Sequence, residues 1–297
     1  MSRKITLREL EGNLNFFSKM YDVVRLIDPT RKEVLDCEFL HPQDIGTTCY
    51  NYWNRGAVCE NCISMRAYRE NKTFMKLENI SKDIFLSIAI PIETDNDPVV
   101  LELLKKVTDT MMFGYGDFAK NELMYDVVAD LNKTAMKDHL TGCYNRRFLD
   151  DRLSTDIVQA TLNGSSLSII FIDIDNMKTV NDNFGHSAGD KALKHVASIL
   201  EECVHNEKNW VVRYGGDEFI ICLNDTTAEQ ATLIQNQINN HFESKHILLK
   251  DQNVKISISM GLVTMDDKPY TAEEIIQMAD RKMYESKWRN RSSKRPV

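Results

Sequence analysis

The sequence lacks any long apolar run. Nowhere do about 18 apolar residues follow one another, the length that a membrane-spanning helix needs. The start, MSRKITLRELEGNLNFF, also lacks the apolar core of a signal peptide. Internal repeats and low-complexity segments are absent as well. We therefore expect a cytoplasmic protein with no membrane span.

An excess of basic residues is also missing. The chain has 37 Lys and Arg against 44 Asp and Glu, a formal net charge of −7. This balance argues against a general nucleic-acid binder. The length of 297 residues predicts two domains, each large enough to bury a core.

The first domain is predicted over residues 1–110. β-rich runs at 21–28, 33–38, 84–92 and 99–107 flank a helical or loop section, which indicates a small α+β module. This arrangement resembles the PAS family of sensor domains. Many PAS modules end in an Asp-x-Thr step, whereas residues 106–109 here read KVTD, so the acidic residue of that step is missing.

Cysteines gather in this first domain. The chain has seven cysteines, and in such a protein we expect reduced thiols or metal ligands rather than disulfides. The first-domain cysteines follow a C-x9-C-x2-C pattern with one more thiol upstream, which could close a tetrahedral Zn²⁺ site or hold another metal. Thiols packed in a small core, or a redox pair, are the alternatives. The four candidate ligands are Cys37, Cys49, Cys59 and Cys62.

A helical linker is predicted over residues 111–137. Met124, Val127 and Leu131 fall at spacings of three and four, which is typical of a narrow apolar seam on a helix. Such a helix can pair with its copy in a second chain. The alternative is an amphipathic helix packed on its own domain.

The second domain is predicted over residues 138–297. Its expected order is βαββαβα, with helices covering one sheet in an α/β or α+β sandwich. The expected elements are helices at 145–162, 188–204, 228–242 and 272–288, strands at 167–175, 209–224 and 246–264, and a loop at 181–185.

Carboxylates follow two of these strands. The run at 215–219 (GGDEF) separates two β-rich segments, so it predicts a hairpin whose two central glycines both have positive φ. Asp173 and Asp175 end the buried strand before it, and alone they could be a strand-ending turn. Beside Asp217 and Glu218 they form an acidic group that a hard cation such as Mg²⁺ would neutralise.

Several motifs in order resemble the GGDEF family, the diguanylate cyclases that join two GTP molecules into cyclic di-GMP and release pyrophosphate. The matching segments are 138–147 (DHLTGCYNRR), 171–175 (FIDID), 177–190 (MKTVNDNFGHSAGD), 215–219 (GGDEF) and 279–292 (ADRKMYESKWRNRS). Cys143 replaces the usual Leu, and Met177 stands where Phe is commoner. The resemblance implies a palm-like nucleotidyl-cyclase sandwich around a central mixed sheet.

The resemblance also implies roles for individual residues. Asp173, the main-chain carbonyl of Ile174 and Asp217 should hold Mg²⁺, which Mn²⁺ can replace. Asp217 should help to deprotonate the attacking ribose 3′-hydroxyl, with Glu218 in support. The implied substrate contacts are Lys178, Lys287 and Arg291 for the phosphates, Asn181 and Asp190 for guanine, and His186 nearby or merely packed beside Gly185.

Two copies are needed in this family, because each domain holds one GTP. We therefore expect a homodimer that is controlled by the first domain. The alternatives are a catalytically silent GTP-binding or cyclic di-GMP-signalling module and a structural dimerisation scaffold. Many members bind inhibitory product at an R-x-x-D motif, whereas residues 206–209 here read NEKN. Product inhibition at that position is not expected.

Overall fold

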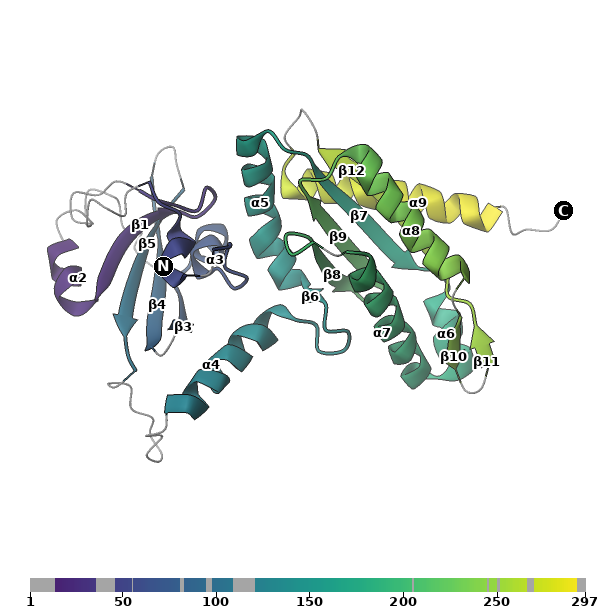
Figure 1. Ribbon diagram of the computed structural model, residues 1–297, viewed down its shortest axis with the longest axis horizontal. Coiled ribbons are helices and arrows are strands. Elements are labelled where there is room, and N and C mark those ends of the chain that lie inside the picture. The colour runs from purple at the N-terminus through teal and green to yellow at the C-terminus, as the bar shows by residue number, and fades with distance from the viewer. Residues whose placement is uncertain are drawn as a thin grey trace. The chain divides into compact units, whose positions relative to one another are not determined.

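The computed structural model describes residues 14–35, 46–54, 56–80, 83–94, 98–108, 121–204, 206–244, 246–249, 252–265 and 270–292. The chain divides into two compact units, residues 1–135 (unit 1) and residues 136–297 (unit 2). Figure 1 shows a separate sheet in each unit. Cys37 and residues 111–120 of the predicted linker lie outside the described residues. Among the described residues, no helix has both the length and the apolar character needed to cross a membrane.

Unit 1 is built on a five-stranded antiparallel sheet with the order β2-β1-β5-β4-β3. Helix α3 packs on β3, β4 and β5. Leu26, Leu101 and Leu103 form part of the core beneath α2. The elements are α2 (Leu14–Met20), β1 (Val23–Asp28), β2 (Glu33–Val34), a 3-10 helix (Cys49–Trp53), α3 (Ile63–Glu70), β3 (Phe74–Ile80), β4 (Asp83–Ile92), β5 (Val99–Lys106) and α4 (Asn121–Met136).

Strand β3 was not expected from the sequence. Apolar residues do not alternate along it, because Lys76 and Glu78 point inward and form an ion pair with little exposed surface. The buried pair takes positions that apolar side chains normally fill in a half-buried strand.

Helix α4 is fastened to unit 1 by a polar side chain. Asn132 donates through Nδ2 to the carbonyl of Leu77 at 2.9 Å, and its Oδ1 accepts from Asn61 Nδ2 at 2.9 Å. Val128 is buried, whereas Val127 and Leu131 are 46% and 62% exposed. The helix therefore packs on its own unit and still presents part of the predicted apolar seam to solvent.

Unit 2 is a three-layer sandwich around a mixed sheet with the order β12-β7-β9-β8-β6. Helices α7 and α8 contact each other on one face, and α5 contacts α9 on the other (Figure 1). The elements are β6 (Tyr144–Asn145), α5 (Arg146–Asn163), β7 (Leu167–Ile174), α6 (Met177–Phe184), α7 (His186–Cys203), β8 (Trp210–Gly215), β9 (Glu218–Asn224), α8 (Ala228–Ser244), β10 (Ile247–Leu249), β11 (Gln252–Val254), β12 (Ile258–Met265) and α9 (Ala272–Ser292).

The loop expected at residues 181–185 is wrong for residues 181–184, because they form the end of helix α6. The consecutive polar residues Asn181, Asp182 and Asn183 suggested a loop, although apolar residues line one face of this helix. Met177 and Val180 are buried three residues apart, as in an amphipathic helix. Gly185 follows the helix with a φ of +84°, and its N–H bonds to the carbonyl of Asn181.

The GGDEF turn also differs from expectation. Gly215 pairs with Glu218, so the two loop residues are Gly216 and Asp217 rather than the two glycines. Gly216 has a φ of +51°, whereas Gly215 and Asp217 do not have positive φ. A positive φ at the first loop position alone fits a type II′ turn. Asp217 therefore lies at the tip of the hairpin.

Strand β7 is buried along its whole length. Ile170, Ile172 and Ile174 belong to the core cluster that includes α7. The alternate residues face the α5 and α9 layer. On that face α9 comes very close to β12, because a Cβ on Gly261 would lie 2.1 Å from the carbonyl oxygen of Ala279. Glycine at this position therefore lets α9 pack closely on β12, the neighbour of β7 in the sheet.

Candidate functional site

Three polar residues form a row across neighbouring strands of unit 2. Asp173 on β7 lies opposite Glu218 on β9 and opposite Ser259 on β12. Directly opposed residues of antiparallel strands share one face of the sheet. The row therefore faces the α9 layer, at the end of β7.

The tip of the hairpin is tied to this row. Ile174 donates its N–H to the carbonyl of Asp217 at 3.1 Å. Because Ile174 directly follows Asp173, this bond fixes Asp217 next to the cross-strand pair. The structure thus brings together the predicted Mg²⁺ ligands Asp173, Ile174 and Asp217.

Arg213 braces the turn from the other side. Its Nε and Nη2 donate to the carbonyl of Gly216 at 3.0 and 2.8 Å, and its Nη1 donates to Asp138 Oδ1 at 3.0 Å. The same Asp138 oxygen accepts from the N–H and hydroxyl of Thr141. Burial acts to raise the pKa of Asp138, but these hydrogen bonds hold it below its ordinary value. Arg213 thereby links the entry motif at residue 138 to the GGDEF turn.

The charges around Asp173 are unbalanced. Burial raises the pKa of Asp173, and the charges of Asp217 and Asp175 add to the rise, although Lys287 opposes it. Burial also raises the pKa of Glu218, helped by Asp173, Asp217 and Asp280. The ammonium of Lys287 contacts Asp173 Oδ1 directly. Five carboxylates thus interact around one cation.

This donor set fits a hard divalent cation, which prefers carboxylate and carbonyl oxygens. A cation would relieve the repulsion that raises the pKa of both Asp173 and Glu218. The ammonium of Lys287 now supplies positive charge beside Asp173. Within the described residues, no three acidic, His or Cys side chains are already placed to hold an ion. Binding a cation would therefore require Lys287 to move off Asp173.

Asp175 also makes hydrogen bonds of its own. Its Oδ1 accepts from the Ser259 hydroxyl at 2.8 Å, and its N–H donates to the carbonyl of Ser257 at 2.9 Å. These bonds join the end of β7 to the start of β12. Asp175 therefore orients the strand end and adds negative charge to the site.

The predicted guanine and phosphate contacts lie on α6 and α7. Lys178 is exposed near the start of α6, and His186 and Asp190 are exposed in the first turns of α7. Asn181 packs against Gly189, since a Cβ on that glycine would lie 1.9 Å from Asn181 Oδ1. Among the described residues, no hydrogen bond or ion pair joins these four to the carboxylates. Arg291 belongs to α9, but its side chain lies outside the described residues.

The segment in place of R-x-x-D has a structural role. Asn206 Oδ1 accepts from the N–H of Lys208, whose Nζ pairs with Asp225 at 2.6 Å. Asn209 Oδ1 accepts from the N–H of Asn224 at 2.8 Å. These bonds tie the turn before β8 to the end of β9.

The cysteines of unit 1 are not arranged as a metal site within the described residues. Cys49 and Cys62 are buried, and Cys59 is partly exposed. No group of three metal-ligating side chains is placed around an ion position in the described part of the chain. Cys62 Sγ instead accepts a hydrogen bond from Lys32 Nζ at 3.3 Å. The zinc hypothesis, which includes Cys37, stays a prediction.

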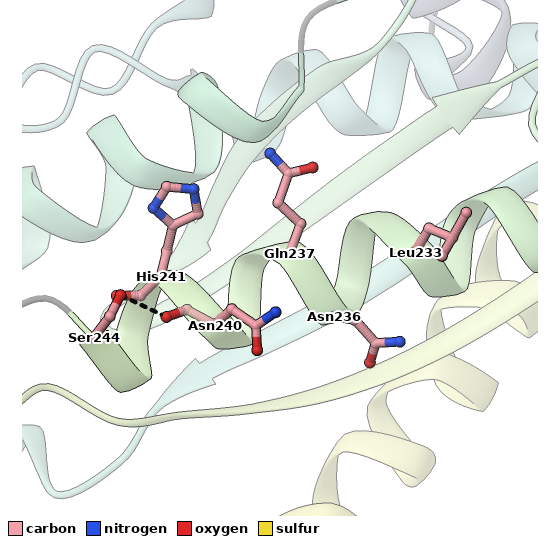
Figure 2. Close-up of a pocket in the computed structure, with 6 residues that line it drawn as sticks. All are labelled: Leu233, Asn236, Gln237, Asn240, His241 and Ser244. Carbon is pink, nitrogen blue, oxygen red and sulfur yellow. Dashed lines mark hydrogen bonds between the residues drawn. The ribbon is translucent and has the colours of Figure 1, made fainter.

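A hollow on α8 is lined by none of the predicted site residues (Figure 2). Every lining residue comes from this one helix, and Ser244 bonds to the Asn240 carbonyl. The lining has no carboxylate to hold a cation and no Lys or Arg to hold phosphate. The lining residues are Leu233, Asn236, Gln237, Asn240, His241 and Ser244.

Sequence reasoning missed Ser259, Asp280 and Arg213 as members of the site. Asp280 and Arg213 lie inside or beside recognised motifs, so proximity to those motifs was an available signal. Ser259 carried no such signal, because its place depends on the register between β12 and β7.

Comparison with known proteins finds one domain in unit 2. Residues 135–293 match the family model described as diguanylate cyclase, GGDEF domain. Diguanylate cyclase A of Treponema denticola is 30% identical over 235 residues, 73% of this chain and 62% of that protein. Response regulator PleD of Caulobacter vibrioides is 31% identical over 181 residues, 60% of this chain and 38% of that protein. The chain thus spans less than two thirds of these relatives.

A solved structure agrees with the fold. The coiled coil and GGDEF domain of DgcB from Caulobacter crescentus, in complex with c-di-GMP, superposes with a TM-score of 0.53 at 26% identity. The match covers 57% of this chain and 89% of that one.

Replacing Glu218 should stabilise the metal-free protein. The pKa of Glu218 in the folded state lies above its ordinary value of about 4.3. The contribution of Glu218 to the free energy of unfolding is therefore fully present below that value, where the carboxyl is protonated. It is lost as pH rises through the folded pKa, because the ionised carboxylate is unfavourable in the folded site. Glu218→Gln should therefore raise the thermal unfolding midpoint at pH 7 in the presence of a chelator. The gain should shrink toward pH 4.

Glu229→Gln is the matched control. Glu229 is exposed, and a backbone hydrogen bond and Thr227 lower its pKa, so its loss should not stabilise the protein. A Glu218→Gln midpoint at pH 7 no higher than that of Glu229→Gln would contradict the electrostatic account of the site.

Proposed function

Since residues 135–293 carry its domain, this chain belongs to the GGDEF diguanylate cyclase family, and we propose that it condenses two GTP molecules into cyclic di-GMP with release of pyrophosphate. The main support is the group of carboxylates around Asp173, gathered at the end of β7 with Lys287 as their cation. Diguanylate cyclase A of Treponema denticola, named above, supports the same activity.

Mg²⁺, or Mn²⁺ in its place, would be held by Asp173, the carbonyl of Ile174 and Asp217. The raised pKa of Asp173 supports this assignment, because burial and neighbouring carboxylates make added negative charge unfavourable there. When bound, the ion would supply positive charge to the triphosphate and polarise the attacking hydroxyl.

The chain's own residues would move the proton and position the phosphates. Asp217, at the hairpin tip, accepts the proton of the ribose 3′-hydroxyl, and Glu218 beside it supports that role. The 3′-oxygen then forms a bond to the α-phosphorus of the second GTP, while the bond from that phosphorus to pyrophosphate breaks. Lys178 and Lys287 neutralise charge on the phosphates, and Arg291 is assigned the same role from its motif.

Guanine recognition is assigned to α6 and α7. The Asp190 carboxylate can accept from both N1–H and N2–H₂ of guanine, a donor pair that adenine does not offer. Asn181 packs against Gly189, the residue before Asp190, which supports a shared subsite. His186 lies four residues before Asp190 on the same exposed helix start.

Two copies of the chain would have to meet, because one domain holds one GTP. The exposed Val127 and Leu131 on α4 support pairing through this helix. The solved DgcB structure includes a coiled coil with its GGDEF domain. We propose a homodimer for this chain, with α4 as part of its interface.

Unit 1 is proposed to be a PAS-like sensor that controls the cyclase. Its support is the small antiparallel sheet with the order β2-β1-β5-β4-β3 and the helices around it. Two hydrogen bonds of the Asn132 side chain join α4, the helix that precedes the cyclase domain, to the rest of this unit. A change in unit 1 can therefore act on the helix that would pair the two chains.

The activity is tested by incubating the full chain with GTP and Mg²⁺ and measuring cyclic di-GMP by chromatography. Asp217→Asn should lower turnover by about 10²-fold or more, because it removes the proposed proton acceptor. Asp225→Asn, an exposed carboxylate at the end of β9, should leave turnover within about twofold of the wild type. Binding of GTP without any product would indicate a silent nucleotide-binding module. Full turnover in Asp217→Asn would refute the assigned role.

Product should not inhibit through residues 206–209. The side chains there are engaged in the turn between α7 and β8, and the segment lacks an Arg fork for phosphate. Turnover measured with added cyclic di-GMP should be the same for the wild type and for Lys208→Ala. Potent inhibition that Lys208→Ala relieves would show that the segment binds product after all.

Asn132→Ala should loosen α4. Loss of both hydrogen bonds removes about 2 kcal/mol of local stability, so amide exchange in residues 126–136 should rise by roughly tenfold or more. Lys133→Ala changes an exposed neighbour and serves as the control for helix propensity. Equal amide exchange rates in the two variants would show that the Asn132 hydrogen bonds do not hold α4 on unit 1.

A further inference from the structure

The sheet of unit 2 has a free edge at β12, and a hollow lies along it. Strand β12 ends the order β12-β7-β9-β8-β6, so within the described residues it pairs with β7 alone. Helices α8 and α9 both contact β12 (Figure 1). The hollow, which we call the edge groove, has a volume of about 540 Å³ and is lined by residues 260–262 of β12 together with residues of α8 and α9.

The backbone groups of β12 alternate between β7 and the free edge. Asp175 donates its N–H to the carbonyl of Ser257 at 2.9 Å, and the pairing of β12 with β7 continues from there without a shift in register. In an antiparallel pair, every second residue makes the hydrogen bonds to the neighbouring strand. Gly261 therefore bonds to β7, whereas the N–H and C=O groups of Met260 and Leu262 point toward the free edge.

This edge offers donors and acceptors in the spacing of a polypeptide. A phosphate or another small anion would meet the N–H groups but would also face carbonyl oxygens, which repel it. An extended peptide matches both kinds of group, as in β-strand addition. Lys282 Nζ donates to the carbonyl of Leu262 at 2.8 Å and so covers one acceptor. Within the described residues, no side chain makes such a bond to the backbone of Met260.

The two faces of the edge groove differ in polarity. The side chains of Met260 and Leu262 lie on the face that packs against α7 and α8, where Met260 belongs to the core and Leu262 is partly buried against it. Gly261 faces α9, because a Cβ on this glycine would meet the α9 backbone. A strand added to this edge would therefore have an apolar face and a face toward α9.

The charged side chains that line the edge groove all belong to α9. Lys282 and Arg289 are exposed and donate to main-chain carbonyls, those of Leu262 and Glu285. Within the described part of the chain, no carboxylate forms an ion pair with either cation. Glu285 is the one carboxylate of the lining. Two cations against one carboxylate leave an excess of one positive charge, which favours acidic over basic side chains in a partner.

We propose that the edge groove binds an extended segment of another protein, in which apolar and acidic residues alternate, by adding it to the sheet beside β12. Directly opposed residues of paired strands share one face. The apolar side chains of the segment would lie with Met260 and Leu262, and its acidic side chains would lie beside Gly261, toward Lys282 and Arg289.

A second copy of this chain fits the edge groove poorly. Pairing of β12 with the same strand of another copy about a two-fold axis would place identical surfaces opposite each other. The cations of both α9 helices would then lie on the same face of the joined sheet and repel each other. Charge therefore favours a partner of different sequence.

The carboxylate site uses other residues of α9. Lys287 contacts Asp173, and Asp280 helps to raise the pKa of Glu218, whereas none of these four residues lines the edge groove. Binding of a peptide can therefore be measured without nucleotide or metal, and its outcome is independent of cyclase activity.

The test measures amide exchange along β12 by NMR in the full chain at low salt, with and without a blocked hexapeptide in which valine and glutamate alternate. At saturation, the amides of Met260 and Leu262 should exchange about tenfold more slowly, because they gain hydrogen-bond partners. Gly261 and Val263 are internal controls, since their N–H groups already bond to β7 and should change less.

Two altered peptides separate the backbone from the charge. The peptide with lysine in place of glutamate should bind about tenfold more weakly. The peptide with methylated amide nitrogens should not protect Met260 or Leu262, because it cannot donate to β12. Equal protection by the methylated peptide would refute strand addition.

Variants of α9 test the role of its cations. Arg289→Glu should weaken binding of the valine–glutamate peptide by about fivefold. Arg281→Glu changes the net charge equally at an exposed position outside the lining, so it should change binding by less than about twofold. Equal binding by both variants would refute the charge assignment.

Two results in the wild type would overturn the proposal without any variant. The first is unchanged exchange of Met260 and Leu262 at about 1 mM of the valine–glutamate peptide. The second is slower exchange of these amides when the protein alone is concentrated, which would make a second copy of the chain the occupant.

Discussion

The cross-strand contact between Asp173 and Glu218 is the constraint on which unit 2 depends. The pairing of β7 with β9 places two carboxylates opposite each other on a largely buried sheet face, and the turn adds Asp217. Hydrogen bonds and an ion pair around the two carboxylates offset this repulsion. Arg213 braces the turn, and Gly261 lets α9 approach closely enough for Lys287 to reach Asp173. A bound cation would relieve the repulsion between these carboxylates.

Much of this site could be predicted from the sequence, because its motifs are contiguous. The buried strand ending at Asp173 and the hairpin at Asp217 follow from apolar runs and turn residues. Contacts that depend on register could not be predicted, as Ser259 illustrates. The turn residues were misplaced by one position, because the pairing of Gly215 with Glu218 is set by the sheet rather than by the glycines. Strand β3 was missed because a buried ion pair takes the place of alternating apolar residues. Helix α6 was missed because a run of polar residues follows its buried apolar residues.

Both units bury charged side chains. In unit 2 the excess charge is negative and lies at the end of β7, where a cation would bind. In unit 1 the buried charged residues include Arg25, Lys32 and Glu102, and Lys32 Nζ donates to Cys62 Sγ. Helix α4 meets the second cluster through Asn132 and Asn61, one residue from Cys62.

The central claim is that Lys287 and a divalent cation compete for Asp173, and calorimetric titration of the nucleotide-free chain with Mg²⁺ tests it most directly. Lys287→Met should bind Mg²⁺ several-fold more tightly than the wild type, because the competing ammonium is gone. Asp173→Asn should lose measurable binding. Equal Mg²⁺ affinity in the wild type and both variants would contradict the account, since it would separate the cation from the carboxylate on which the proposed chemistry depends.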